Sequence, residues 1–261
     1  KSLQKVYPDE PQVSLKLGHL ARQKGQRQVA LDCFEQAEKL AHNPAQVDTI
    51  QLLIVNELRS LNRLDEALIN VRALVERSPE NVNARVTMAS VLREQMDYDA
   101  AEQVHRETAA AAPTDIPSQL ALANLLSETH RISAAIDLLE ELHDQSKQRS
   151  FPVMMRLGAL HKAEEDWESA RYWYQLAKKY YPHKLPVYGA LADILYLQGE
   201  IDAAIALLMQ ARERFPDAPE IPLRLANLKL RFGQLDESLK ILKGAHQRFP
   251  NHPQLIFQLC R

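Results

Sequence analysis

Apolar residues recur along the chain at the spacing of amphipathic helices, in segments of about 14 residues separated by short polar connections. Within 185–208, for example, Leu191 and Leu195 share one helical face, and Ile201 and Ile205 share another. Each such pair of segments predicts two helices joined by a turn. No apolar run reaches the ~20 residues that a membrane-spanning helix needs.

Three series of residues repeat in one register with a period close to 34 residues. Small residues mark the second segment of each pair, at Ala30, Ala67, Ala101, Ala135, Ala170, Ala204 and Ser238. A large apolar residue followed by a small or short one marks the first segment, at 17–18, 54–55, 88–89, 122–123, 157–158, 191–192 and 225–226. Prolines follow the second segment at Pro79, Pro113, Pro182, Pro216 and Pro250. Small side chains let two helix axes approach to ~8–10 Å, and proline ends a helix.

These three series resemble the tetratricopeptide repeat, a helix–turn–helix unit of 34 residues. The resemblance implies an all-α fold, a right-handed superhelix of about seven hairpins, with repeats starting near 11, 48, 82, 116, 151, 185 and 219. Residues 1–10 and 253–261 are predicted to be partial repeats, and 1–261 to form one superhelical domain. Because neither end carries a polar capping repeat, we expect the segment to belong to a longer superhelix.

Some details of the register depart from the pattern. The first unit runs 37 residues, and we assign Pro44 as its late terminal proline; the fourth has Lys147 where proline is expected. Gly25, Gly199 and Gly233 stand between the two helices of their units, where a glycine cap is expected.

Composition and charge narrow the function classes. The 46% hydrophobic and 25% charged residues exclude a disordered chain, and a net charge of -2 favours neither nucleic acid nor an anionic membrane as partner. No HExxH, Cys/His metal spacing or Gly-x-Ser-x-Gly motif is present. We therefore expect no enzyme activity in this segment, no metal and no cofactor.

The cellular compartment is not fixed by Cys33 and Cys260. Two compartments stay open: the bacterial periplasm or envelope, which we favour, and the cytoplasm.

The resemblance also implies where a partner binds. In the family, groove-facing residues fall at positions 2, 5, 9, 12 and 13 of each repeat. On this sequence the implied partner-binding residues are Arg22, Asn56, Arg59, Arg93, Asn124, Lys162, Asp193, Tyr196 and Asn227. Position 5 is apolar apart from Gly189, so the family's clamp for C-terminal carboxylates is not expected.

Arg22, Arg59 and Arg93 would form a cationic row beside asparagine amides, which suits a protein or peptide segment with acidic and apolar residues. A solvated helix face explains the same arginines without a partner. Tyr172 and Trp173 fall toward the outer face of the fifth repeat, and two interpretations stay open: an exposed aromatic pair that forms a second contact site, or packing against the next repeat.

Three functions remain in competition. The first is a scaffold that binds a partner segment in its groove. The second is the arm of a bacterial exopolysaccharide export or envelope assembly protein that recruits a periplasmic partner. The third is a substrate-guiding or regulatory arm of an enzyme whose catalytic domain lies outside the segment.

Overall fold

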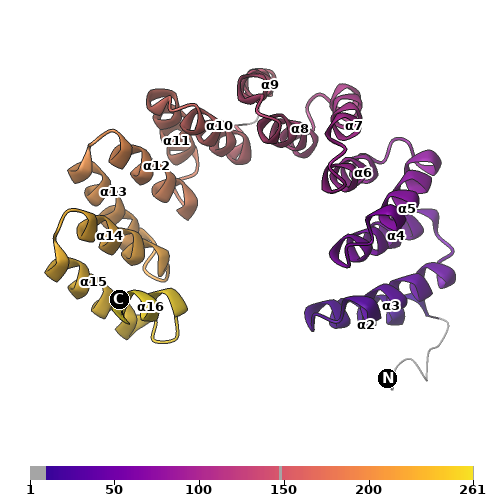
Figure 1. Cartoon of the computed structure of the whole chain (residues 1–261), viewed down its shortest axis with the longest axis horizontal. Coiled ribbons are helices and arrows are strands. Elements are labelled where there is room, and N and C mark those ends of the chain that lie inside the picture. Colours follow the sequence, from indigo (N-terminus) through magenta and orange to yellow (C-terminus); the bar gives the residue numbers. More distant parts are fainter. Residues whose placement is uncertain (1–9, 147–148, 261) are drawn as a thin grey trace. The chain divides into compact units, whose positions relative to one another are not determined.

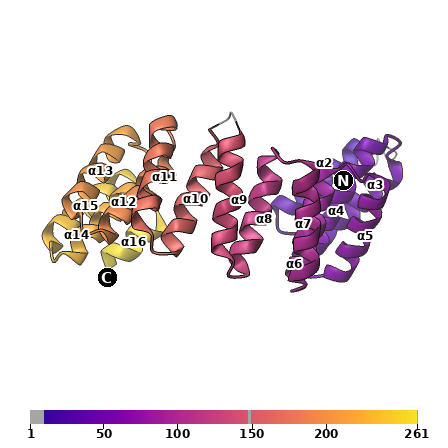
Figure 2. The same ribbon diagram turned by 90° about the horizontal axis from the view of Figure 1, so that it is seen from above.

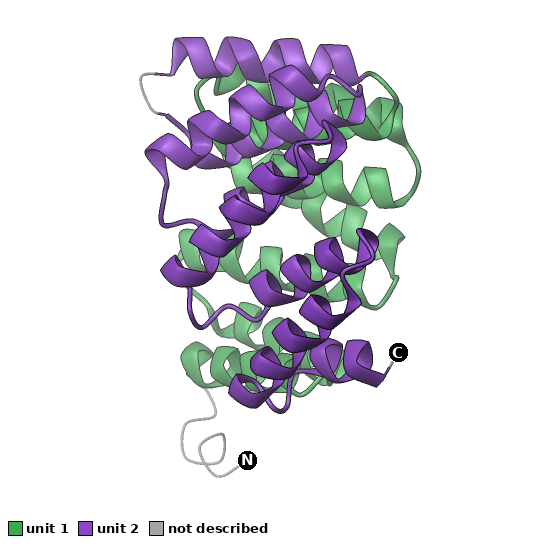
Figure 3. Cartoon of the chain, turned by 90° about the vertical axis from the view of Figure 1, so that its left-hand side faces the viewer, with its two compact units in different colours: residues 1–131 green, residues 132–261 purple. Residues whose placement is uncertain are grey.

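The computed structural model describes residues 10–146 and 149–260, in which α-helices are joined by short turns and no strand occurs. The predicted partial repeat at 1–10 and Lys147 lie outside these ranges, apart from Glu10. The chain divides into two compact units, residues 1–131 and 132–261, and each is described by itself (Figure 3). The single domain over 1–261 stays a prediction.

Each unit is a row of helices. Unit 1 contains α2 (Pro11–Gln23), α3 (Arg27–Leu40), α4 (Pro44–Ser60), α5 (Leu64–Arg77), α6 (Val82–Glu94), α7 (Tyr98–Ala111) and α8 (Ile116–Glu128). Unit 2 contains α9 (Ile132–Gln145), α10 (Phe151–Ala163), α11 (Trp167–Tyr180), α12 (Leu185–Leu197), α13 (Ile201–Arg214), α14 (Glu220–Arg231), α15 (Leu235–Arg248) and α16 (Pro253–Cys260).

Within each unit every helix packs on the next one along the chain. The even-numbered first helices of the hairpins lie on one side of their unit, and the odd-numbered second helices lie on the other (Figure 1). Figure 2 shows the helices of unit 2 running alongside one another as hairpins. The predicted all-α hairpin-repeat fold is confirmed.

The predicted repeat starts agree with the helix starts to within one residue, except at Pro44. That residue does not end the first repeat, because α4 begins there, four residues before the predicted start at Asp48. Asn43 caps this helix by accepting the N–H of Ala45 at 3.0 Å. Proline lacks an N–H and fits the first turn of a helix as well as the turn after one, so spacing alone misplaced the boundary.

One position in every intra-repeat turn has a left-handed backbone. Counted from the predicted repeat starts, which number all repeat positions below, it is the fifteenth residue of each repeat, with φ between 59° and 80°, at Gly25, Asn62, Met96, His130, Glu165, Gly199 and Gly233. The three glycines confirm the predicted caps. The other four turns have the same conformation with a side chain present, so the geometry is imposed by the hairpin and not by glycine.

Gly199→Ala and Gly244→Ala are expected to change stability in opposite directions. An added Cβ meets no atom within 4 Å at either site, so only the backbone differs. Gly199 has φ +80°, and alanine there should lower the free energy of unfolding by about 1 kcal/mol. Gly244 lies inside α15, where alanine should raise it by up to about 1 kcal/mol. Urea denaturation of both variants measures this, and the same sign in both would contradict the backbone account.

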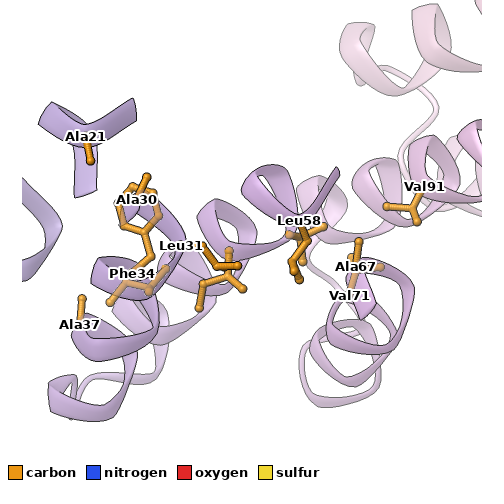
Figure 4. Packing of buried hydrophobic residues seen from close by; sticks show 12 residues of the cluster. Ala21, Ala30, Leu31, Phe34, Ala37, Leu58, Ala67, Val71 and Val91 are labelled. Carbon is orange, nitrogen blue, oxygen red and sulfur yellow. The ribbon is translucent and has the colours of Figure 1, made fainter. Parts of the chain in front are cut away.

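Within each unit, a buried cluster extends from one hairpin into the next. In unit 1, Ala21, Leu31, Phe34, Leu58 and Val71 belong to one buried cluster spread over α2 to α6 (Figure 4). At the far end of unit 2, Leu255 of α16 is fully buried against Leu223 and Leu242, whereas Phe257 is 68% exposed. In these clusters each hairpin therefore helps to complete the core of its neighbour.

Side-chain size is matched inside the hairpins. The small residue at position 8 of the first helix faces the residue at position 24 of the second. Where position 8 is glycine, position 24 is aromatic: an added Cβ would lie 2.4 Å from Cε1 of Phe34 at Gly18, and 2.5 Å from Cε1 of Tyr174 at Gly158. The repeats with Ala192 and Ala226 at position 8 have leucine at position 24, whereas the repeat with Ala89 has His105 there. Each hairpin thus keeps its spacing with a different pair of side chains.

Candidate functional site

The three arginines predicted as a cationic row lie on the first helices of unit 1, and each is paired with a carboxylate of the next repeat. Arg22 Nε lies 2.7 Å from Glu57 Oε1, Arg59 Nη2 lies 2.5 Å from Glu94 Oε1, and Arg93 Nη1 lies 2.8 Å from Glu128 Oε1. These side chains are parts of ion pairs that connect consecutive repeats. The row is therefore not a line of uncompensated cations.

Glu57 is the most buried member of this set, with 1% of its side chain exposed. Arg22 and Arg27 both contact it, the second at 3.2 Å. A buried carboxylate needs such compensation, because removing it from water costs several kcal/mol. Arg22 thus has a structural reason to stand where it does.

Asn56 and Arg59 share a pocket of about 500 Å³ with Asn62 and Glu94. Arg59 donates from Nη1 to Asn56 Oδ1 at 3.0 Å and holds Glu94 through both Nε and Nη2. Its guanidinium is fixed on two sides, so the pocket presents an ordered polar wall. Asn124, on α8, is half-buried and does not line this pocket.

A second pocket lies in unit 2 between α12 and α14, with a volume of about 200 Å³. Asp193, Tyr196 and Asn227, three of the predicted residues, line it together. They come from positions 9 and 12 of one repeat and position 9 of the next. This is where the structure brings the predicted site residues together from neighbouring repeats.

The side chain of Arg224 crosses this pocket to α12, where it contacts Gly189 and the carboxylate of Asp193, one turn apart. Its Nη1 lies 3.0 and 3.1 Å from the two oxygens of Asp193. A Cβ at Gly189 would lie 3.0 Å from the guanidinium carbon. The only non-apolar residue at position 5, Gly189, is therefore the place where the guanidinium rests on the helix.

Tyr196 carries the aromatic side of the same pocket. The guanidinium of Arg231 lies over its ring, 5.1 Å from the centroid, and the ring of Phe232 packs against it edge-on at 6.2 Å. Arg231 pairs with no carboxylate among residues 10–146 and 149–260. The pocket therefore holds one compensated and one uncompensated cation beside an aromatic ring, with the exposed Asn227 amide at its edge.

The remaining predicted residues lie elsewhere in unit 2. Lys162 is half-buried near the end of α10. Tyr172 is 58% exposed on α11, as predicted, but Trp173 is only 7% exposed. Its ring packs edge-on against His143 of α9 at 5.0 Å. The prediction of an exposed aromatic pair is wrong for Trp173, because α9 of the preceding repeat covers it.

Sequence reasoning missed Arg224 and Arg231. Arg231 stands at position 13, one of the groove positions that the resemblance names, and that position could have found it. Arg224 stands at position 6, outside that set. Its role depends on the missing side chain of Gly189 in the repeat before, which no pattern within a single repeat reveals.

Profiles described as tetratricopeptide repeat match residues 11–43, 52–116, 161–221 and 195–260, which together make up most of the chain. The chain belongs to the tetratricopeptide repeat family. No functionally curated protein matches the sequence. Proteins of this family bind protein or peptide partners, so the general function supported for the chain is that of a protein-interaction scaffold.

Solved tetratricopeptide repeat structures share this fold. A tetratricopeptide repeat protein from Parabacteroides merdae ATCC 43184 is 14% identical over 95% of this chain and 97% of its own, with a TM-score of 0.61. PilW, described as a widely conserved type IV pilus biogenesis factor, is 14% identical over 82% and 99%, with a TM-score of 0.62. Pseudomonas aeruginosa pilF is 16% identical over 83% and 99%, with a TM-score of 0.59. At these identities the likeness shows the fold alone.

The described residues of this tetratricopeptide repeat chain contain neither a candidate membrane span nor a candidate metal site. None of their helices is both long and apolar enough to cross a bilayer. No group of three or more His, Cys, Asp or Glu side chains in these ranges is placed to hold a metal ion.

Proposed function

We propose that this chain holds a partner protein by binding a segment of it in the pocket between α12 and α14. The observation that carries the proposal is the meeting of Asp193, Tyr196 and Asn227, from two neighbouring repeats, around one hollow that also contains Arg224 and Arg231. A site shared between repeats exists only when the hairpins are stacked. A partner that binds there therefore recognises stacked hairpins and not an isolated one.

The chemistry of the pocket selects the kind of segment. Arg231 is free to bind a carboxylate, and its stacking on Tyr196 fixes the plane of the guanidinium. The amide of Asn227 can bond the backbone of a segment whatever its sequence. Tyr196 and Leu228 supply an apolar surface next to the cation. The preferred segment thus carries an acidic residue close to an apolar one.

The pocket in unit 1 supports the same role but offers a partner different chemical groups. Its arginine is fully engaged by Glu94 and Asn56, so it offers amide and carboxylate groups and no free cation. We propose that it contacts partner backbone through Asn56 and that the acidic preference arises in unit 2. The exopolysaccharide-export and enzyme-arm alternatives gain no support from any described residue, and neither is proposed.

Peptides selected from a random displayed library on the whole chain provide the test. The selected set is expected to contain acidic and apolar residues side by side. Arg231→Glu should weaken their binding at least tenfold, about 1.4 kcal/mol, and Asn227→Ala should weaken it less, both measured by isothermal titration. Both residues are exposed, so the fold should survive.

Tyr172→Ala is the matched control, because it removes an exposed ring from α11, outside the pocket. It should leave affinity unchanged. Selected peptides that bind the Arg231→Glu and Asn227→Ala variants as tightly as the original chain would show that the segment is not held here.

A further inference from the structure

In several repeats the side chain of the fourth residue bonds to the end of the repeat before it. That side chain donates a hydrogen bond to the carbonyl of the preceding turn proline, six residues back. The pairs are Arg85 Nε to Pro79 O at 2.6 Å, Gln119 Nε2 to Pro113 O at 3.1 Å, and Tyr188 hydroxyl to Pro182 O at 2.8 Å. The carbonyl that ends one repeat is thus satisfied by the start of the next.

Tyr188 shows how completely this slot can be filled. The residue is 1% exposed, and its ring packs edge-on against Phe215 at 5.3 Å. The ammonium of Lys178 lies 5.5 Å from the ring centroid. In this slot the tyrosine hydroxyl donates to a carbonyl, the ring packs edge-on against another aromatic ring, and a cation lies over its face.

One repeat later the same slot has no filling side chain. Position 4 is Pro222, which has no donor and is much smaller than tyrosine. A pocket of about 340 Å³ lies there, lined by Pro216, Arg212 and Phe249. These are the residues 34 positions after Pro182, Lys178 and Phe215. The walls of the tyrosine slot are therefore repeated, with its occupant missing.

Two further differences widen this pocket and set its charge. Gly244 stands where the preceding repeat has Gln210, and a Cβ added to Gly244 would meet nothing within 4 Å. The lining contains three basic side chains, Arg212, Lys240 and Arg248, and no acidic one. Arg248 is engaged by Asp217 at 3.0 Å, whereas Arg212 and Lys240 form no ion pair among the described residues.

We propose that the pocket between α13 and α15 binds a tyrosine side chain of a partner segment whose flanking residues are acidic. The hydroxyl donates to the Pro216 carbonyl, the ring packs on Phe249 beneath the Arg212 guanidinium, and acidic neighbours face Arg212 and Lys240. The occupant is inferred from the chain's own Tyr188. This site lies on the second-helix side of unit 2 and is separate from the pocket between α12 and α14.

The probe is the peptide Ac-Glu-Glu-Tyr-Glu-Glu-amide, titrated into the ¹⁵N-labelled whole chain and followed by NMR. The amides of Gly244, Ala245 and Phe249 are expected to shift. The matching phenylalanine peptide should bind several-fold more weakly because it lacks the hydroxyl, and the alanine peptide at least tenfold more weakly. Equal binding of the alanine peptide would reduce the site to unspecific charge attraction and overturn the proposal.

Two variants close the pocket from opposite walls. Pro222→Tyr should place a tyrosine where Tyr188 lies one repeat earlier, raise the melting temperature and weaken peptide binding at least tenfold. Gly244→Leu fills the open space beside α15 and should weaken binding to the same extent, so the test stands even if one variant misfolds. Met209→Tyr, at a 45% exposed position of α13, adds a tyrosine outside the pocket and should change nothing.

The outcome separates this proposal from the function proposed above. Arg231→Glu should leave the peptide-induced shifts of Gly244, Ala245 and Phe249 unchanged, since that residue lines only the other pocket. Shifts confined to α12 and α14, full binding by both closing variants, or no binding of the tyrosine peptide would each overturn the assignment.

Discussion

Gly158→Ala is expected to destabilise the chain by about 2 kcal/mol, although alanine is the better helix former. The added methyl would lie 2.5 Å from Cε1 and 2.7 Å from Cδ1 of Tyr174. Tyr174 is 3% exposed, and we expect α10 and α11 to separate in order to accommodate the methyl. Urea denaturation followed by circular dichroism measures the change.

A second substitution in the same hairpin should restore most of the loss. Tyr174→Leu alone leaves a void and costs about 2 kcal/mol or more. Combined with Gly158→Ala, it recreates the alanine–leucine pair that Ala192 and Leu208 form in the next repeat. The coupling between the two changes should reach about 2 kcal/mol. Simple additivity of the two losses would contradict the matching of positions 8 and 24.

The second large effect depends on pH. Stability is expected to fall by about 2 kcal/mol between pH 7 and pH 4.5 through His105 alone. This side chain is 3% exposed on α7, and burial, with a smaller contribution from the charge of Arg93, lowers its pKa from 6.5 to about 4. Between those two values the unfolded chain binds a proton that the folded chain cannot, so unfolding is favoured as the pH falls.

His105→Leu removes this dependence and nothing else that titrates. Leucine occupies the same position of later repeats, at Leu208 and Leu242, so the substitution suits the fold. Carboxylates with lowered pKa values, such as Glu102 beside Arg131, also lose stabilisation in acid, but they do so equally in both proteins. The difference in urea-unfolding free energy between the two proteins should therefore change with pH. A constant difference from pH 7 to 4.5 would contradict the buried, neutral histidine.

The fold was predictable because its determinants repeat within the sequence. The alanine and proline series located nearly all first helices to within one residue. Pro44 was the exception, since proline is equally suited to open a helix and to follow one. The left-handed turn was visible at Gly199 but hidden at Met96, where the hairpin imposes the conformation on an ordinary residue.

The site was less predictable, because it is built between repeats. The groove position of Arg59 follows from its place in its own repeat. Its ion pair with Glu94 could not be predicted in the same way, because Glu94 stands at a different position of the next repeat. Trp173 looked exposed on its own helix and is covered by His143 of another. The empty slot beside Pro222 could have been suspected from the 34-residue spacing of Tyr188 and Pro222. That the turn proline's carbonyl accepts the hydroxyl of Tyr188 is visible only in the structure.

Hydrogen exchange of the whole chain, with and without a saturating selected peptide, tests the central claim most directly. The proposed function predicts that bound peptide slows exchange in α12 and α14 around Tyr196 and Asn227, and that Arg231→Glu abolishes the protection. Protection confined to α13 and α15, or protection in α12 and α14 that persists in the Arg231→Glu variant, would contradict it.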